Sequence, residues 1–307
     1  MRLTILGCSG SMSGPDGAAS SYLLQADGYD DDGKLRTYSI VMDFGPGAMG
    51  QLLRHLDPAE LDAVFLSHLH ADHCVDITGM QVYRRWFPTG PLPRIDVYSP
   101  EDGQARTRQI GGDPEDETYE GEFNFVKMTP GDTAQVGPMV LEAFDTWHTV
   151  PGVGLRITGP SETDPGREVV FAYTGDSDLC DAQVEMARRV DLLLSECAFE
   201  DGRDSVRGVH MTGSRAGQLA QDAGVALEEI EKVSKTLAAL IQNISNAARQ
   251  QASSAGHISN TMNVIQEITS QTSAGTTATA KSIGNLAKMA SEMRRSVSGF
   301  TLPDGQA

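Results

Sequence analysis

One short segment of this chain carries four side chains that could bind a metal. Residues 67–73 read Ser-His-Leu-His-Ala-Asp-His and follow a short apolar run that is typical of a buried strand. Side chains alternate between the two faces of an extended backbone, so His68 and His70 are expected to point the same way, with Asp72 and His73 on the turn that follows. Zinc and similar metals take imidazole and carboxylate donors, and a catalytic site leaves one position open for water. The segment therefore predicts a catalytic metal site at the edge of a sheet.

Two more potential ligands follow later apolar segments. Residues 139–146 and 169–174 are expected to be strands; His148 comes just after the first and Asp176 just after the second. The recurring pattern in the first three-quarters of the chain is a strand that delivers one histidine or aspartate to its end. Ligands that are far apart in sequence can converge on one site in this way.

Two further residues are candidates for proton transfer. His210 precedes a helix expected at 214–223, and Glu196 follows a short strand expected at 191–194. A histidine can protonate a leaving oxygen as a general acid, and a neighbouring carboxylate can orient its ring. The structural alternatives are a histidine packed at a helix start and a glutamate in a surface salt bridge.

The elements that must position these residues are mostly short strands. Further strands are expected at 2–6, 22–25, 38–42, 63–66, 95–98, 123–128 and 154–158, and helices at 48–55, 77–86 and 180–189. The polar stretches 27–34 and 111–121 are expected to be loops. His55 stands alone on the first of these helices and is expected to be exposed, with no role in catalysis.

Charge and composition divide the chain into two parts. Of the 307 residues, positions 1–227 hold 17 Lys/Arg and 36 Asp/Glu, whereas positions 228–307 hold 7 and 6. A body this acidic repels a phosphate backbone, so small substrates and metal cations are favoured over long nucleic acid. The four cysteines show no C-x-x-C spacing, which indicates reduced thiols and a cytoplasmic location. Residues 1–7 are too short an apolar stretch for a signal peptide, so none is expected, and no apolar run is long enough to predict a membrane span.

The motifs of the first part resemble those of a known hydrolase family. His-x-His-x-Asp-His at 68–73, His148 and Gly175-Asp176, with Met-Asp-Phe-Gly-Pro-Gly at 42–47, are similar to the metallo-β-lactamase-fold hydrolases. The segments 146–151 and 210–213 resemble those of the ribonuclease Z-like and cyclic-nucleotide phosphodiesterase branch. The resemblance covers residues 1–227 and implies an αββα sandwich with metals at one edge of its two sheets.

The same resemblance implies two metals, most simply Zn²⁺, with Mn²⁺ or Fe as other options. It assigns the first metal to His68, His70, His148 and Asp176, and the second to Asp72, His73 and the shared Asp176. Two cations about 3.5–4 Å apart can hold a hydroxide and neutralise the oxygens of a phosphodiester. Asp72 could also orient that hydroxide, and His210 and Glu196 would serve as the general acid and its partner.

This chain departs from the family pattern near residue 228. The family continues with a strand that ends in Thr-His, whose histidine completes the second metal's ligands, but here Glu-Glu-Ile-Glu-Lys follows at 228–232. The second metal site is therefore expected to lack one ligand, and the second sheet its last strand. Weaker metal occupancy and reduced activity should follow.

Residues 228–302 show a different repeat, with apolar residues in two companion series that each recur every seven residues. From Ile230 to Phe300, eight of the eleven residues at this spacing are apolar, and no proline interrupts them. Such heptads predict a long coiled-coil helix, softened where small polar residues crowd positions 270–280. The segment resembles the C-terminal arm of the signalling domain of methyl-accepting chemotaxis proteins of the twitching-motility type, and residues 303–307 are expected to be disordered. Without a second arm, the apolar series is expected to drive self-association.

The sequence leaves three readings of function. The first is a metal-dependent phosphodiesterase that acts on a small cyclic nucleotide or related phosphodiester through metal-bound hydroxide. The second keeps the fold but changes the substrate to an RNA 3′ end, a thioester or a lactone. The third is a non-catalytic interaction protein derived from a chemoreceptor.

Overall fold

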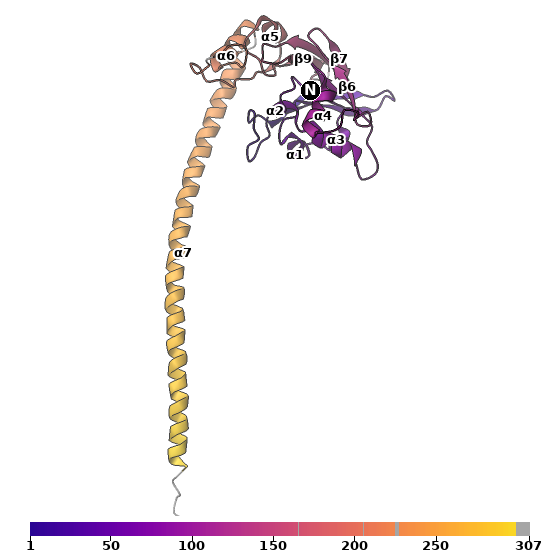
Figure 1. The fold of residues 1–307 in the computed structure, drawn as a ribbon. Helices are drawn as coiled ribbons and strands as arrows, with labels where there is room; N and C mark the ends of the chain where they lie inside the picture. Colours follow the sequence, from indigo (N-terminus) through magenta and orange to yellow (C-terminus); the bar gives the residue numbers. More distant parts are fainter. Residues whose placement is uncertain (165, 205, 225–226, 299–307) are drawn as a thin grey trace, which may run out of the picture. The chain divides into compact units, whose positions relative to one another are not determined.

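The computed structural model describes residues 1–298 except 165, 205 and 225–226, and it leaves the side chains of 227–246 undescribed. Its contacts divide the chain into two compact units, Met1–Glu228 and Glu229–Ala307 (Figure 1). The expected disordered end at 303–307 lies outside the described residues.

The first unit contains one sheet of six strands in sequential order. These strands are β1 (Arg2–Gly7), β2 (Ser21–Tyr29), β3 (Leu35–Met42), β4 (Ala63–Phe65), β5 (Ile95–Ser99) and β6 (Phe123–Lys127). The first three pair antiparallel, and β3 to β6 pair in parallel. The β2–β3 hairpin is longer than expected, because the polar residues 27–29 pair with 35–37. Since β3, β4 and β5 run in parallel, the loops that follow them leave from the same edge of the sheet.

The second sheet has five strands in the order β11-β10-β9-β8-β7. They are β7 (Thr133–Val136), β8 (Met139–Asp145), β9 (Val153–Pro160), β10 (Glu168–Tyr173) and β11 (Leu192–Leu194). All pairs are antiparallel except β10 with β11. Within the described residues no strand lies beyond β11, so this sheet ends there.

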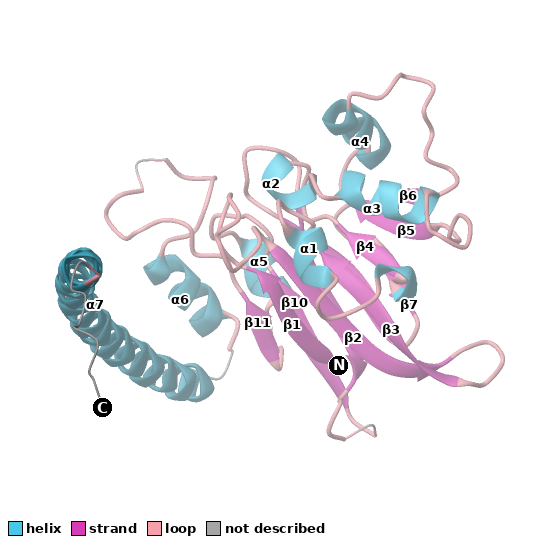
Figure 2. Cartoon of the chain, turned by 90° about the horizontal axis from the view of Figure 1, so that it is seen from below, coloured by secondary structure: helices cyan, strands magenta, loops and turns pink. Residues whose placement is uncertain are grey.

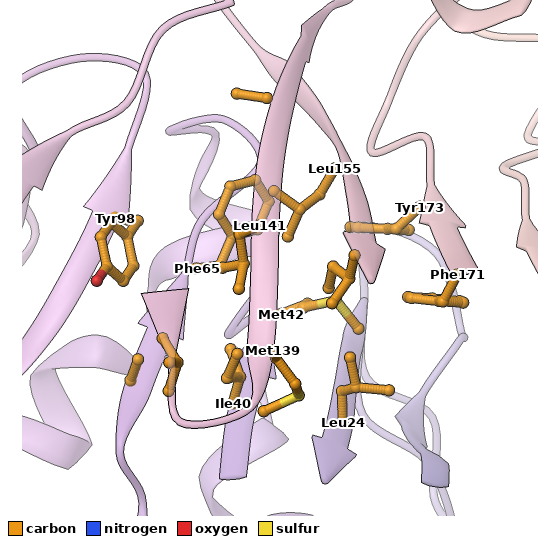
Figure 3. Close-up of a cluster of buried hydrophobic side chains, with 14 of the residues drawn as sticks. Leu24, Ile40, Met42, Phe65, Tyr98, Met139, Leu141, Leu155, Phe171 and Tyr173 are labelled. Carbon is orange, nitrogen blue, oxygen red and sulfur yellow. The ribbon is translucent and has the colours of Figure 1, made fainter. Parts of the chain in front are cut away.

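The main core lies between the two sheets. In β3, Ile40 and Met42 are buried in the cluster shared with the second sheet, whereas Val41 between them packs on the opposite face. Leu141 and Leu155 belong to the same shared cluster from the other side (Figure 3). The period of two along each strand produces this division, because successive side chains point to opposite faces.

Short helices cover the outer faces of the two sheets (Figure 2). They are α1 (Ala48–Leu52), α2 (Ala71–Cys74), α3 (Ile77–Arg85), α4 (Gly103–Gly111), α5 (Asp181–Met186) and α6 (Gly213–Asp222), with a 3₁₀ turn at Pro58–Glu60. Leu52 of α1 and Met80 of α3 share a cluster with Val41 and Val64 of the first sheet. Met186 of α5 packs against Ala172 of β10, while Leu219 of α6 packs with Leu193 of β11. The unit is therefore the expected αββα sandwich.

The described part of the second unit lies almost entirely in one long helix, α7 (Leu227–Val297). The helix continues through residues 270–280, where the small polar residues were expected to soften it. The hydroxyls of Thr269, Thr272 and Thr276 each donate to the carbonyl four residues earlier, so their hydrogen-bond donors are satisfied within the helix itself. Among the described helices, α7 included, none has the length and apolar character that crossing a bilayer requires.

Candidate metal centre

The loop that follows β4 joins the two sheets at one edge. Ser67 and His68 continue the chain beyond β4, and the carbonyl of Ser67 accepts a hydrogen bond from the amide of Val153 at 2.8 Å. His68 forms an isolated bridge with Gly152, which directly precedes β9. The metal-binding segment is thus fixed to the second sheet by its backbone, next to the ends of β8 and β10.

The eight candidate residues from the sequence lie together at this edge. Three overlapping groups have donor atoms within 4.8 Å of one another: His68, His70 and His148; His68, His73 and Asp176; His148, Asp176 and His210. Asp72 Oδ2 lies 3.8 Å from His73 Nε2, and Glu196 contacts His210. His55 is exposed at the end of α1, and His257 belongs to α7.

The imidazole nitrogens converge on a common point. His68 Nε2 lies 3.1 Å from His70 Nδ1, and His148 Nε2 lies 3.2 Å from the same atom. Three nitrogen lone pairs this close repel one another unless a proton or a cation lies between them. Together with Asp176 Oδ2, which is 3.9 Å from His68 Nε2, they form a donor set of the kind that binds zinc, manganese or iron.

The protonation states suit metal binding. Burial, and then the nearby His73, lower the pKa of His68 to about 2, so this ring is neutral. Burial alone would raise the pKa of Asp176, but its hydrogen bond and charge interaction with His73 outweigh that effect and lower it. A neutral imidazole and an ionised carboxylate are the forms in which these side chains bind metals.

His73 is held between two carboxylates. Its Nδ1 lies 2.7 Å from Asp43 and its Nε2 lies 3.3 Å from Asp176. Burial would lower the pKa of His73, but the two carboxylates outweigh it and raise the pKa to about 11. A metal bound at Nε2 would take the place of the proton there.

Asp43 is a functional residue to which the sequence reasoning gave no role. Its side chain is fully buried and accepts hydrogen bonds from the amide and hydroxyl of Ser67 (2.7 and 2.8 Å), from His73 Nδ1 (2.7 Å) and from the hydroxyl of Tyr173 (2.5 Å). It therefore fixes the ring of His73 and the start of the metal loop together. Asp43 follows the apolar strand β3 directly, and His148 and Asp176 come within three residues of the ends of β8 and β10, so this shared pattern could have found it.

Replacing Asp43 by alanine should strongly destabilise the first unit. The change leaves the buried His73 and three other donors without their acceptor, and loss of one partner of a buried pair costs about 3–5 kcal/mol. Asp43→Asn is the comparison variant and should lose less stability, because asparagine keeps one of the two acceptor oxygens and tolerates the positive φ of 55° at this position. Urea unfolding of the metal-free protein measures both. Equal stability of Asp43→Ala and wild type would contradict this account.

His148 and His210 approach the site from the other side. His148 Nδ1 donates to the carbonyl of Val209 at 2.7 Å, which leaves Nε2 to face His70. His210 Nδ1 lies 3.0 Å from Glu196 Oε1 and 3.7 Å from Asp176 Oδ2. The hydrogen bond to Glu196 raises the pKa of His210 against the effect of burial.

Glu196 is held in place by the backbone. Its Oε1 accepts from the amide of Ser177 at 2.9 Å and its Oε2 from the amide of Ala198 at 3.0 Å. The side chain is only 10% exposed, which differs from the surface salt bridge considered for it. The pair of Glu196 and His210 thus has a defined orientation beside Asp176.

Residues 38–228 of this chain match the sequence model of a protein family described as the beta-lactamase superfamily domain. The uncharacterized protein Rv1339 of Mycobacterium tuberculosis is 38% identical over 229 residues, which cover 73% of this chain and 78% of that protein. This chain belongs to the metallo-β-lactamase superfamily. The crystal structure of the metallo-β-lactamase fold protein YhfI from Bacillus subtilis is similar, with a TM-score of 0.58 and 26% identity over 72% of this chain and 82% of that one. Ribonuclease Z of Methanosarcina acetivorans is 24% identical over 280 residues, 73% of this chain and 85% of that protein.

The C-terminal region has a relative of its own. Over 108 residues the chain is 82% identical to Protein PilJ of Pseudomonas aeruginosa, a match that covers 34% of this chain and 16% of PilJ. The predicted combination of a metallo-β-lactamase domain with a chemoreceptor segment is confirmed. The superfamily and the His/Asp donor set mark the first unit as a metallo-hydrolase with a metal site.

Proposed function

We propose that this protein is a metal-dependent phosphodiesterase that acts on a small cyclic nucleotide or a related phosphodiester. The observation that carries the proposal is the convergence of His68, His70, His73, His148 and Asp176 at one sheet edge, with His210 and Glu196 beside them. The ribonuclease Z relative supports a phosphodiester as the substrate class. Zinc fits the donor set best, and manganese and iron fit it too.

Each residue has a distinct task in this reaction. A bound divalent metal would supply Lewis acidity and a water molecule of lowered pKa. His68, His70 and His148 would hold it on one side, and Asp176 would face it from between His68 and His73. His210, whose Nδ1 is hydrogen-bonded to Glu196, would donate a proton to the leaving oxygen.

The groove beside His148 favours a compact substrate. It measures about 330 Å³ and contains no lysine or arginine. Its lining consists of Pro100, Thr129, Pro130, Asp145, Thr146, His148, Thr149, Val150, Pro151 and Gly152. A groove without cations, in a body with net negative charge, disfavours a long polyanion such as RNA. The RNA 3′ end, thioester and lactone readings remain the alternatives within the same fold.

Hydrolysis of bis-p-nitrophenyl phosphate, with and without a chelator, tests the proposal. Activity that disappears with the chelator and returns with added zinc or manganese is expected, followed by hydrolysis of cyclic AMP. Metal-dependent cleavage of a thioester or a lactone alone would favour the second reading. A metal-loaded protein that cleaves none of these would favour the non-catalytic reading, to which the missing second-site histidine also points.

We propose in addition that α7 associates with other copies of itself. Its described part exposes an apolar series with heptad spacing, made of Ile258, Met262, Ile265, Ile283, Leu286, Met293 and Val297. Self-pairing of helices would bury this series. Light scattering is expected to give a multiple of the 32.9 kDa chain mass, and the double variant Ile265→Asp/Leu286→Asp the mass of one chain. A wild-type protein that stays monomeric when concentrated would rule this assembly out.

A further inference from the structure

A buried charge cluster lies just outside the donor set. Asp178, two residues after Asp176, has a fully buried side chain. It accepts hydrogen bonds from the amides of Leu179 (2.8 Å) and Gly208 (2.9 Å), and it pairs with Arg207 and, at 2.8 Å, with Arg215 Nε. Burial of a carboxylate costs desolvation free energy that only close pairing and hydrogen bonds offset, so loss of its charge should disturb all of these partners.

Apart from Leu179, the partners of Asp178 lie in one loop or contact it. This loop connects β11 with α6 and, in its described part, has no helix or strand to stiffen it. Arg215 on α6 donates to the carbonyl of His210 at 2.8 Å and pairs with Asp204. Gly208 directly precedes Val209, whose carbonyl accepts from His148 Nδ1. These contacts hold the loop on both sides of Val209 and His210, the two residues that contact His148 and Asp176.

Trp147 also contacts both Asp178 and this loop. Its backbone pairs with Asp178, whose amide donates to the carbonyl of Trp147 at 2.8 Å. Arg207 lies over the indole ring, 5.2 Å from its centroid. Gly208 has φ +74° and lies so close to the ring that a Cβ there would be 2.4 Å from Nε1, so only glycine fits. Trp147, just before His148, and Asp178, two residues after Asp176, are therefore both held in contact with the loop that carries His210.

We propose that Asp178 is a positioning residue that holds residues 206–210 in register, so that Val209 fixes the tautomer of His148 and His210 faces Asp176. Without its charge, Arg207 and Arg215 lose their common partner and the amide of Gly208 loses a strong acceptor. The loop then moves away from the site, which takes the Val209 carbonyl from His148 and the imidazole of His210 from the leaving oxygen. The inference rests on the proposed function for its catalytic readout only.

Asp178→Asn tests the proposal, with Glu122→Gln as the matched control. Glu122 is also a buried carboxylate paired with arginine, Arg85 at 2.7 Å, but it belongs to the α3 side of the first sheet. Residues that support a metal ligand typically contribute about 10- to 100-fold in affinity or activity, and a loss of that size is expected for Asp178→Asn alone. Metal affinity is measured with zinc and a competing chelator.

The choice of leaving group separates positioning from simple destabilisation. Cyclic AMP expels an alkoxide that needs a proton, whereas bis-p-nitrophenyl phosphate expels a stable phenolate. At a saturating zinc concentration, Asp178→Asn should therefore lower kcat for cyclic AMP more than for the nitrophenyl ester, with little change in KM. Equal losses on both substrates, or the same losses in Glu122→Gln, would overturn the proposal.

Hydrogen exchange of the metal-free protein gives a readout that needs no activity. Peptides that cover residues 199–211 should exchange faster in Asp178→Asn than in wild type and in Glu122→Gln. Arg207→Gln, at a side chain that is 52% exposed, serves if Asp178→Asn does not fold, and it should show the same changes to a smaller extent. Unchanged exchange and metal affinity in both variants would refute the role of Asp178, whereas a wild type that cleaves no phosphodiester would refute only the proposed function.

Discussion

Replacing Asp176 by alanine is expected to remove both the metal and the hydrolytic activity of this protein. Its Oδ2 lies 3.3 Å from His73 Nε2, 3.9 Å from His68 Nε2 and 3.7 Å from His210 Nδ1. Asp176 is the one carboxylate in the three donor groups found among the described residues, and it belongs to two of them. The loss should exceed the roughly 100-fold that removal of a merely supporting residue can cause, because Asp176 itself would contact the metal.

Elemental analysis and the bis-p-nitrophenyl phosphate assay measure this loss on the same preparation. Asp31→Ala, in the exposed hairpin loop between β2 and β3, is the control for the removal of a carboxylate and should retain both properties. If Asp176→Ala kept its metal and its rate of hydrolysis, the cluster of His and Asp donors at the sheet edge would not be the catalytic site.

His210→Ala should lower turnover while the metal content stays constant. A positioned general acid contributes about 10²- to 10⁴-fold, and a loss in this range is expected for cyclic AMP. His210 has the geometry for this role because Glu196, which is itself held by two backbone amides, accepts from its Nδ1 and leaves Nε2 free for the substrate. The nitrophenyl ester should suffer much less, since its leaving group needs no proton.

The steady-state rate on both substrates, with metal analysis of each sample, decides this prediction. His55→Ala is the control, because His55 is exposed on the α1 side of the first sheet. Unchanged turnover of cyclic AMP by His210→Ala would remove this residue from the mechanism. A parallel loss of metal would instead assign His210 to the metal ligands, a role its place in the group with His148 and Asp176 allows.

The elements that the sequence did not predict are those with weak local signals. The four-residue helix α2 begins within the metal segment itself, and α4 lies in a polar region where a loop was expected close by. Strand β7 has only four residues and lies at the edge of its sheet. Short elements carry too few residues for a periodic pattern, so their form depends on the strands and helices that pack against them.

The sequence by itself determined the donor set, the division of the chain near residue 228 and the heptad spacing of α7. Each of these is a local property: the spacing of ligands after an apolar run, a change in composition, or a period along one helix. Only the tertiary structure decided how the ligands are oriented. Asp43 reaches Tyr173 across 130 positions, Val209 reaches His148 across 61, and Gly208 reaches Asp178 across 30. Such contacts depend on the register of two facing sheets and on the path of one loop, and these are set by packing of the whole domain rather than by any pattern along the chain.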